Sequence, residues 1–282
     1  MIAPLPVLLY DDIVRRALLE DLGGAGDVTT DALIPAWLET RAAIVARAAG
    51  RVAGLDAALH AFRLLDARVE ADVRRGDGED AAAGETLALV RGPARALLTG
   101  ERVALNLLGR LCGVATLTRD VVARLEGCRA RVVCTRKTTP GLRVLEKHAV
   151  RLGGGANHRF GLDDAVLIKD NHRRLAGGVG ESVRRARAAV SHMTVIEAEV
   201  ETLAELDEAL EAGADALLLD NFGLAELRAA VARVAGRVPT EASGGITPDN
   251  ARAVAETGVD LLSLGFLTHS ARSLDVALDV PA

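Results

Sequence analysis

Polar side chains and glycines follow six short apolar segments in the second half of the sequence. These segments end in Arg136-Lys137, Lys169-Asp170-Asn171-His172, Glu199, Asp220-Asn221, Ser243-Gly244-Gly245 and Gly265. Strand ends are polar in most proteins because they meet solvent, so one such residue would carry little information. Six in succession, with basic groups, acidic groups and two glycine turns, predict a single polar site at the ends of neighbouring strands.

The segment from Cys134 to His172 is basic, although the whole chain is acidic. It holds seven lysines or arginines and four aspartates or glutamates, a net charge of +3, within a chain of net charge -5. Such a basic cluster would attract a small anion while the chain as a whole repels a polyanion. Arg143, Lys147 and Arg151 have four-residue spacing, which predicts a solvated helix face for these three. The other basic residues flank apolar strands or a glycine loop: Arg136, Lys137, Arg159 and Lys169.

Two groups of glycines stand where a phosphate could bind. Ser243-Gly244-Gly245 lies between a predicted strand and a helix that Thr247-Pro248 is expected to begin, and Gly265 follows the last predicted strand. Backbone N–H groups in such turns bind phosphate oxygens, and phosphate sites after the last two strands recur in α/β barrels. We therefore favour phosphate binding over simple tight turns. Gly153-Gly154-Gly155 is equally consistent with the end of a helix.

The apolar segments that carry these residues alternate with amphipathic ones, as in a parallel sheet with crossover helices. The predicted strands are Arg131 to Thr135, Ala165 to Ile168, Thr194 to Glu199, Ala216 to Leu219, Pro239 to Ala242 and Asp260 to Leu264. Thr202 and Glu205 have the spacing of a capping box, which predicts that a helix begins there. The order favours an α/β barrel or an open doubly wound sheet, and in either the strand ends converge on one rim.

The first half of the chain has a different pattern. We expect an opening helix near residues 9–18, a loop at 26–30, strands at 42–49, 69–74 and 87–90, a helix at 55–65, and a long helix from Pro93 to about Leu125. No Pro-, Gly- or Ser-rich linker marks a domain boundary, so we place it inside the long helix. The expected domains are residues 1–115, residues 116–270, and a tail at 271–282 that packs back on the first domain.

Composition excludes several classes of protein. With 282 residues, of which 50% are hydrophobic and 26% charged, the chain has the balance of one large globular domain or two modest ones. Aromatic residues make up only 2% and the net charge is negative, so nucleic-acid binding is not expected. Cys112, Cys128 and Cys134 form no C-x-x-C pair, which predicts neither disulfides nor a zinc site. With no signal-peptide pattern and no segment long enough to span a bilayer, we expect a cytoplasmic enzyme that acts on small molecules.

Several motifs, taken in order, resemble the quinolinate phosphoribosyltransferase family, also called nicotinate-nucleotide pyrophosphorylase (carboxylating). They are Gly26-Asp27-Val28-Thr29-Thr30, Glu101-Arg102-Val103-Ala104-Leu105-Asn106, Thr135-Arg136-Lys137-Thr138, Gly153-Gly154-Gly155-Ala156-Asn157-His158-Arg159, Leu167-Ile168-Lys169-Asp170-Asn171-His172, Leu219-Asp220-Asn221 and Leu267-Thr268-His269-Ser270. They span nearly the whole chain. His148 and Cys112 stand where the family more often has Tyr and Ser, and no role is assigned to either.

The resemblance implies transfer of the phosphoribosyl group of 5-phosphoribosyl-1-pyrophosphate to quinolinate, with decarboxylation, in NAD biosynthesis. It also implies an α/β fold with an N-terminal α/β sandwich and an incomplete α/β (TIM-like) barrel, a homodimer, and Mg²⁺. The residues implied to surround quinolinate and the phosphoribosyl group are Arg136, Lys137, His158, Arg159, Lys169 and His269, with Arg102 contributed to the neighbouring subunit's site. Glu199 and Asp220 match the acids near the ribose and its metal, and Glu197 stays open as an alternative to Glu199.

The remaining implied residues bind the 5-phosphate: Ser243, Gly244, Gly245 and Gly265. Lys137, Lys169, Glu199 and Asp220 are the implied catalytic residues. One alternative is a nicotinate phosphoribosyltransferase, whose substrate has one carboxylate, but the pairs Arg136-Lys137 and His158-Arg159 favour a dicarboxylate. Another is a molybdate-uptake-associated relative with a binding role, which would leave Glu199 and Asp220 without a purpose beyond solvation. A sugar-phosphate lyase on a full barrel would need eight strand units, and the sequence shows six.

Overall fold

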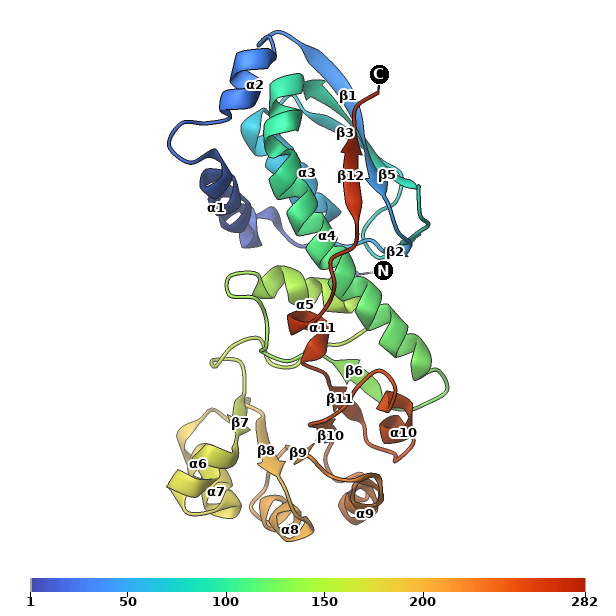
Figure 1. Cartoon of the computed structure of the whole chain (residues 1–282). Coiled ribbons are helices and arrows are strands. Elements are labelled where there is room, and N and C mark those ends of the chain that lie inside the picture. Colours follow the sequence, from blue (N-terminus) through green and yellow to red (C-terminus); the bar gives the residue numbers. More distant parts are fainter. Residues whose placement is uncertain (1, 282) are drawn as a thin grey trace. The chain divides into compact units, whose positions relative to one another are not determined.

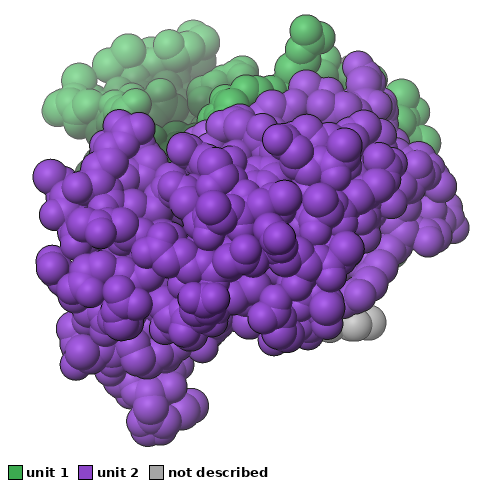
Figure 2. All heavy atoms as spheres, turned by 90° about the horizontal axis from the view of Figure 1, so that it is seen from below, with its two compact units in different colours: residues 1–119, 138–154, 266–282 green, residues 120–137, 155–265 purple. Residues whose placement is uncertain are grey.

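The computed structural model describes residues 2–281, and these form two compact units. Unit 1 takes in the chain up to Arg119, then Thr138–Gly154 and the segment from Phe266 onward, while unit 2 consists of Asp120–Lys137 and Gly155–Gly265 (Figure 2). Each unit is therefore built from more than one stretch of chain. The division of the sequence into domains at residues 115 and 116 stays a prediction.

Unit 1 contains a four-stranded antiparallel sheet with the strand order β12-β1-β5-β3 (Figure 1). Its strands are β1 (Glu39–Ala46), β3 (Glu70–Val73), β5 (Thr86–Pro93) and β12 (Val276–Asp279), and β2 (Gly50–Arg51) pairs separately with β4 (Asp80–Ala81). Along β1 and β5, buried residues such as Ile44 and Val90 alternate with exposed ones such as Arg41 and Leu89. This period of two gives the sheet one face toward the core and one open face. The C-terminal strand β12 lies beside β1, pairing Ala43 with Asp279.

Unit 1 also contains helices, of which the one at residues 55–65 and the first part of the long helix from residue 94 lie beside this sheet (Figure 1). The helices are η1 (Val7–Leu9), α1 (Asp11–Leu22), α2 (Val28–Leu33), α3 (Leu55–Leu65), α4 (Ala94–Arg124), α5 (Arg143–Leu152) and α11 (Phe266–His269), and α4 continues into unit 2. Helix α3 buries Leu55, Leu59 and Phe62, whose spacing of four and three residues places them on one face. The predicted helix at 55–65 and the predicted long helix are confirmed.

The predicted loop at residues 26–30 is wrong in its second half. Helix α2 begins at Val28, because Asp27 is its N-cap and accepts a hydrogen bond from the Thr30 N–H at 2.9 Å. The other Asp27 oxygen accepts from the Thr99 hydroxyl at 2.9 Å. Thr29 and Thr30 have low helix propensity, so a six-residue helix that depends on its cap and on contacts with α4 gives little local signal.

The prediction of a solvated face for Arg143, Lys147 and Arg151 is wrong for Lys147. This lysine lies in α5 and is only 2% exposed, whereas Arg151 is exposed. Four-residue spacing shows which side chains share a face of a helix, but it cannot show whether another segment covers that face.

Unit 2 is a six-stranded parallel sheet with the order β6-β11-β10-β9-β8-β7. Its strands are β6 (Arg131–Val133), β7 (Val166–Ile168), β8 (Ile196–Val200), β9 (Ala216–Asp220), β10 (Thr240–Ser243) and β11 (Leu261–Ser263). All six predicted strands are present, and β6 and β7 form the two edges of the sheet. The predicted fold class, an N-terminal sheet domain followed by an incomplete α/β barrel, is confirmed. A parallel bridge between Val133 and Ala156 adds a short segment beside β6.

The helices of unit 2 follow its strands: α6 (Asp170–Ala176), α7 (Val179–Ala189), α8 (Leu203–Glu211), α9 (Leu224–Val234) and α10 (Ala251–Ala255). Thr202 caps α8 as predicted, accepting from the Glu205 N–H at 3.2 Å. The helix expected at Thr247-Pro248 begins only at Ala251. The reason is a turn closed by Asn250, whose side-chain oxygen accepts from the Thr247 N–H at 2.8 Å. Within residues 2–281, no helix has the length and apolarity that a membrane crossing requires.

Candidate active site

A pocket of about 560 Å³ opens at the carboxyl ends of the parallel strands in unit 2. Every residue that lines it belongs to unit 2, so the unit builds this pocket by itself. Of the predicted site residues, the pocket brings together Arg136, Lys137, His158, Arg159, Lys169, Glu199, Asp220 and Ser243. Asp170, Glu201, Leu218 and Glu241 also line it, and of these the sequence prediction named only Asp170 as a strand-end residue.

Three predicted site residues line neither this pocket nor the adjoining one at the glycine turn. Arg102 lies on α4 and His269 ends α11, and both belong to unit 1. Gly265 is the last residue of unit 2. The Arg102 side chain is 65% exposed, and its nearest carboxylate is that of Glu101 at 4.0 Å.

The predicted phosphate turn forms an adjoining pocket of about 360 Å³, and Ser243 lines both pockets. Gly244 and Gly245 have φ values of +86° and +62°, which side-chain-bearing residues rarely adopt. A Cβ atom on Gly244 would lie 2.2 Å from the Asn221 Oδ1, so the turn has no room for another residue. Asn221 itself has a φ of 58° and donates from Nδ2 to the Asp220 Oδ2 at 2.6 Å. The glycine turn and Asp220 are thus linked by Asn221.

The basic side of the main pocket includes a half-buried arginine, Arg159, whose hydrogen bonds are incomplete. The Nη1 of Arg159 donates to the Ala165 carbonyl at 2.7 Å, but its buried Nε has no hydrogen-bond partner among the described residues. Burial lowers the pKa of Arg159, and the positive charge of Arg136 lowers it further. Two like charges that act on one another in a partly buried pocket are stabilised by a bound anion, so the pocket is suited to an anionic ligand.

The acidic side of the pocket consists of Glu199 on β8 and Asp220 on β9. Burial is the main cause that raises the pKa of each, and the neighbouring positive charge of Lys169 opposes the rise in both. Glu199 also accepts from the Asp170 N–H at 3.3 Å. These two carboxylates supply the oxygen donors that a hard divalent cation prefers, and they are the pocket's best candidates for holding one.

Glu197 lies deeper than Glu199 on the same face of β8. Side chains two residues apart on a strand point the same way, and Glu197 is the one farther from the carboxyl end. Its Oε2 meets the His158 Nε2 at 2.9 Å instead of lining the pocket. The position of Glu199 favours it as the acid that faces a substrate.

Glu241, on β10, is one of the lining residues that the sequence prediction did not name. It stands two residues before Ser243 and therefore on the same inward face, and its Oε1 lies 3.6 Å from the His158 Nε2. It lies inside the predicted strand and not after it, so a rule that places site residues at strand ends does not include it. His158, Glu197 and Glu241 have ligand atoms within 4.8 Å of one another. Both ring nitrogens of His158 already have hydrogen-bond partners, so the ring offers no lone pair to a metal.

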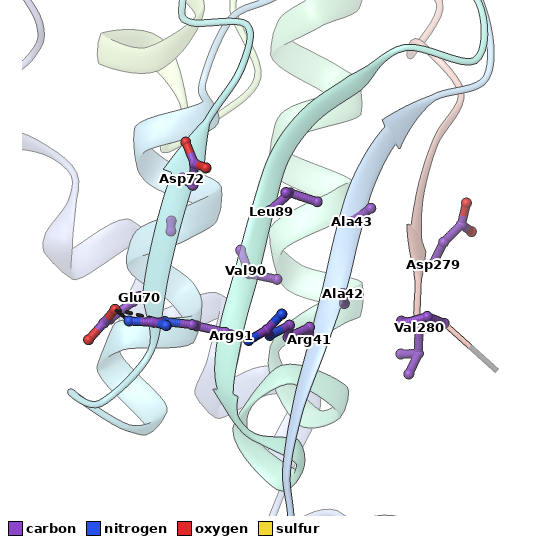
Figure 3. Close-up of a pocket in the computed structure, with 12 residues that line it drawn as sticks. Arg41, Ala42, Ala43, Glu70, Asp72, Leu89, Val90, Arg91, Asp279 and Val280 are labelled. Atoms are coloured by element: carbon purple, nitrogen blue, oxygen red, sulfur yellow. Dashed lines mark hydrogen bonds and ion pairs between the residues drawn. The ribbon is translucent and has the colours of Figure 1, made fainter.

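A larger hollow, of about 690 Å³, lies on the open face of the sheet in unit 1 (Figure 3). Its polar side chains stand on adjacent strands, and the guanidinium of Arg91 on β5 is bonded to Glu70 on β3. Arg41 on β1 is the register partner of Arg91. The hollow has neither the buried acids nor the glycine turn of the pocket in unit 2. Its chemistry is that of a solvated sheet face, and the smaller pocket is the candidate active site.

Comparisons with known proteins show which proteins the chain resembles. The family model described as quinolinate phosphoribosyl transferase, N-terminal domain, matches residues 27–112, and the model of the C-terminal domain matches residues 114–279. The chain is 46% identical to the probable nicotinate-nucleotide pyrophosphorylase [carboxylating] of Bacillus subtilis, over 95% of this chain and 92% of that protein. It is 44% identical to the nicotinate-nucleotide pyrophosphorylase [carboxylating] of Mycobacterium leprae, over 95% and 96% of the two chains. The crystal structure of NadC from Streptococcus pyogenes is 38% identical, with a TM-score of 0.95 over 100% of both chains.

Proposed function

The chain belongs to the quinolinate phosphoribosyltransferase family, and from this premise we propose the reaction that its pocket performs. Quinolinate and 5-phosphoribosyl-1-pyrophosphate are converted to nicotinate mononucleotide, pyrophosphate and carbon dioxide. One observation carries the assignment to this pocket: a cluster of basic side chains and two carboxylates with raised pKa values line the same pocket of about 560 Å³ in unit 2. A protein that only binds its ligand needs no such combination of basic side chains and carboxylates in one pocket. The alternative with a binding role is therefore not favoured.

The basic side of the pocket is proposed to bind quinolinate. Its two carboxylates need two sets of cationic donors, which Arg136 and Arg159 supply as planar guanidinium groups and Lys169 as a point charge. The buried Nε of Arg159, which has no partner among the described residues, is a donor available to one carboxylate. A pocket with this much positive charge distinguishes a dicarboxylate from nicotinate, because the second carboxylate is bound by groups that nicotinate would leave unpaired.

The acidic side is proposed to stabilise the transferring ribose. As pyrophosphate leaves, C1 of the ribose acquires positive charge, and a carboxylate close to it lowers the energy of that transition state. Glu199 and Asp220 are placed for this, since both line the pocket opposite the basic residues. Lys137 and Lys169 face them and offset negative charge on the departing oxygens.

Mg²⁺ is proposed to accompany the pyrophosphate. The donor set fits, because Glu199 and Asp220 offer carboxylate oxygens and Mg²⁺ combines one or two carboxylates with phosphate oxygens. When bound, Mg²⁺ neutralises charge on the pyrophosphate. No residue need act on carbon dioxide release, since glycosylation makes the ring nitrogen cationic and the cationic ring stabilises the carbanion at C2.

The 5-phosphate is proposed to bind at the glycine turn. Gly244 and Gly245 have the positive φ values that let successive N–H groups point to one anion, and Ser243 joins this turn to the main pocket. Gly265 follows β11, next to β10 in the sheet, and is proposed to contribute to the same end. His269 is proposed as a further substrate contact.

We also propose a homodimer in which the partner subunit's Arg102 completes the site. Unit 1 exposes large apolar side chains in its N-terminal helices and just after them: Leu19 at 67%, Val28 at 66%, Leu33 at 71% and Trp37 at 80%. Large exposed apolar groups in one segment are typical of a surface that another protein covers. Arg102, whose side chain is 65% exposed, would then be buried against the partner.

The function is tested by incubating the protein with 5-phosphoribosyl-1-pyrophosphate, Mg²⁺ and either quinolinate or nicotinate. Quinolinate should give nicotinate mononucleotide by mass, with one carbon dioxide released per product. Nicotinate should give little product. Turnover of nicotinate without carbon dioxide would assign the chain to the alternative reaction, and binding of both substrates without turnover would support the binding role.

A further inference from the structure

At the floor of the pocket lie three largely buried side chains that the proposed chemistry leaves unused, and a hydrogen bond between His158 and Glu197 joins two of them. His158 Nε2 lies 2.9 Å from Glu197 Oε2 and 3.6 Å from Glu241 Oε1. The side chains of His158, Glu197 and Glu241 are 12%, 10% and 4% exposed. Burying two carboxyl groups this deeply is destabilising unless nearby hydrogen-bond donors or charges offset the loss of their hydration.

The hydrogen bonds of His158 define its protonation. The backbone N–H of Arg159 donates to Nδ1 at 2.8 Å, so Nδ1 accepts and carries no proton. The proton of the ring is therefore on Nε2, which donates toward Glu197. His158 is a neutral imidazole whose two nitrogens are both used within the protein.

The two buried carboxyl groups have different donors, since His158 Nε2–H donates to Glu197 and the Ser263 side chain donates to Glu241. Burial, and next the charge of Glu197, raise the pKa of Glu241 to about 7, although His158 opposes the rise. A proton held on Glu241 reduces the repulsion between the two carboxyl groups, as in other close acid pairs.

The segment that this imidazole anchors carries a substrate-binding arginine. Residues 157–165 contain no helix or strand, so few backbone bonds hold them. The anchors around Arg159 are its own N–H to His158 Nδ1, its Nη1 to the Ala165 carbonyl, and the Phe160 N–H to Asp164 at 2.7 Å. The first of these ties the segment to the floor of the pocket, because His158 also donates to Glu197 on β8. At the start of the segment, the Cys134 thiol beside β6 donates to the Asn157 Oδ1 at 3.3 Å.

We propose that Glu241 and Glu197 are positioning residues for Arg159. Together they hold the His158 ring with Nε2–H toward the barrel floor, which leaves Nδ1 to accept the Arg159 N–H and sets the guanidinium at the pocket. The kinetic consequence of this assignment rests on the proposed function, in which Arg159 binds quinolinate. The orientation of the ring does not depend on any substrate.

The kinetic test compares Glu241→Gln with Glu241→Ala. Gln keeps the shape of the protonated acid and places a neutral amide group beside Nε2, whereas Ala removes this contact. For E241A we expect the KM for quinolinate to rise roughly 10- to 100-fold with a much smaller change in kcat, because a displaced arginine weakens binding. E241Q should stay within about threefold of wild type. Glu256→Gln, which alters an exposed acid paired with Arg252, is the matched control and should leave KM unchanged.

The second test uses ¹⁵N NMR of the histidine rings in the protein without substrate. The signal of His158, one of six histidines, is assigned by its loss in His158→Asn. We expect Nδ1 unprotonated and Nε2 protonated in wild type and in E241Q, and exchange between tautomers in E241A.

These readouts separate the two proposals. A protein that does not turn over quinolinate but shows the expected tautomer would refute the proposed function alone. An imidazolium, an Nδ1–H tautomer, or a KM in E241A equal to that of wild type would overturn the positioning role. If E241A does not fold, E241Q and the tautomer of wild type still decide the question.

Discussion

Arg110 of α4 and Glu146 of α5 form a buried ion pair within unit 1. The Nε and Nη2 of Arg110 lie 3.0 and 2.8 Å from Glu146 Oε1, and the Glu146 side chain is 0% exposed. Arg110 also donates to the carbonyls of Thr268 and Ala271, so one guanidinium links three segments that are far apart in the sequence. Arg95, Arg102 and Arg110 share one side of the helix by their spacing, and this spacing alone would predict a solvent-exposed face for Arg110.

Removing the charge of Glu146 should destabilise unit 1 strongly. Glu146→Gln leaves the buried Arg110 without its counter-ion, and it also sets an amide group against the Thr139 donors, which lie 2.7 and 3.0 Å from the present carboxylate. Loss of one partner of a buried pair costs about 3 to 5 kcal/mol of unfolding free energy. Urea denaturation measures this cost. Glu256→Gln, in an exposed pair, should change the same quantity by less than about 1 kcal/mol, and an equal effect of the two changes would contradict the buried role.

The strands and the rim of unit 2 could be predicted from the sequence, because both follow from local rules. Apolar runs give the strands, and the residues after each run reach the same rim in any parallel sheet. Lys169, Glu199 and Asp220 were found in this way. Glu241 was missed because it lies one step below the rim, where a carboxyl group is stabilised by His158, a residue 83 positions away in the sequence. The burial of Lys147 also depends on contacts that spacing does not reveal.

Lys137 and Lys169 should be essential for turnover. Both line the pocket, and the charge of each lowers the pKa of Asp220 against the effect of burial. Loss of one partner of a desolvated charge pair costs about 2 to 5 kcal/mol, so kcat/KM should fall roughly 30-fold to several thousand-fold in either alanine variant. Arg174→Ala removes a positive charge that is 74% exposed on α6 and serves as the control. Near-normal kcat/KM in both lysine variants would refute their role.

Glu199 and Asp220 should affect the chemical step more than the binding of quinolinate. Glu199→Gln and Asp220→Asn keep the size of each side chain and remove its charge. We expect kcat to fall, by on the order of 100-fold for a transition-state interaction, while the Kd for quinolinate stays near that of wild type. An acid beside a dianion cannot help to bind it. Calorimetric binding and initial rates measure the two effects, and weaker quinolinate binding at unchanged kcat would reverse the assignment.

Glu241 should make the stability of the protein fall as the pH rises. Its pKa is raised from 4.5 to about 7 in the folded state, so between these values the folded chain binds more protons than the unfolded chain. The contribution of Glu241 to the free energy of unfolding is therefore fully present below about pH 4.5 and is lost as the pH rises past about 7. Its size is on the order of 3 kcal/mol. Glu241→Gln cannot titrate and should lack this part of the slope. Urea denaturation of both proteins from pH 5 to 8 measures how the free energy of unfolding of each depends on pH. Parallel pH profiles for the two proteins would show that the pKa of Glu241 is not raised.

Arg102 should act in the partner subunit's site, which a mixing experiment can detect. Arg102→Ala and Lys169→Ala should each be inactive alone. In a mixed dimer, the intact pocket of the first chain meets the intact Arg102 of the second, so one site of the two is whole. With random exchange, about half of the dimers are mixed, and activity should recover to about a quarter of that of wild type. If Arg102 served its own chain, each subunit in the mixture would keep its own defect. Subunit exchange shown by mass labelling, with no recovery of activity, would therefore exclude the shared site.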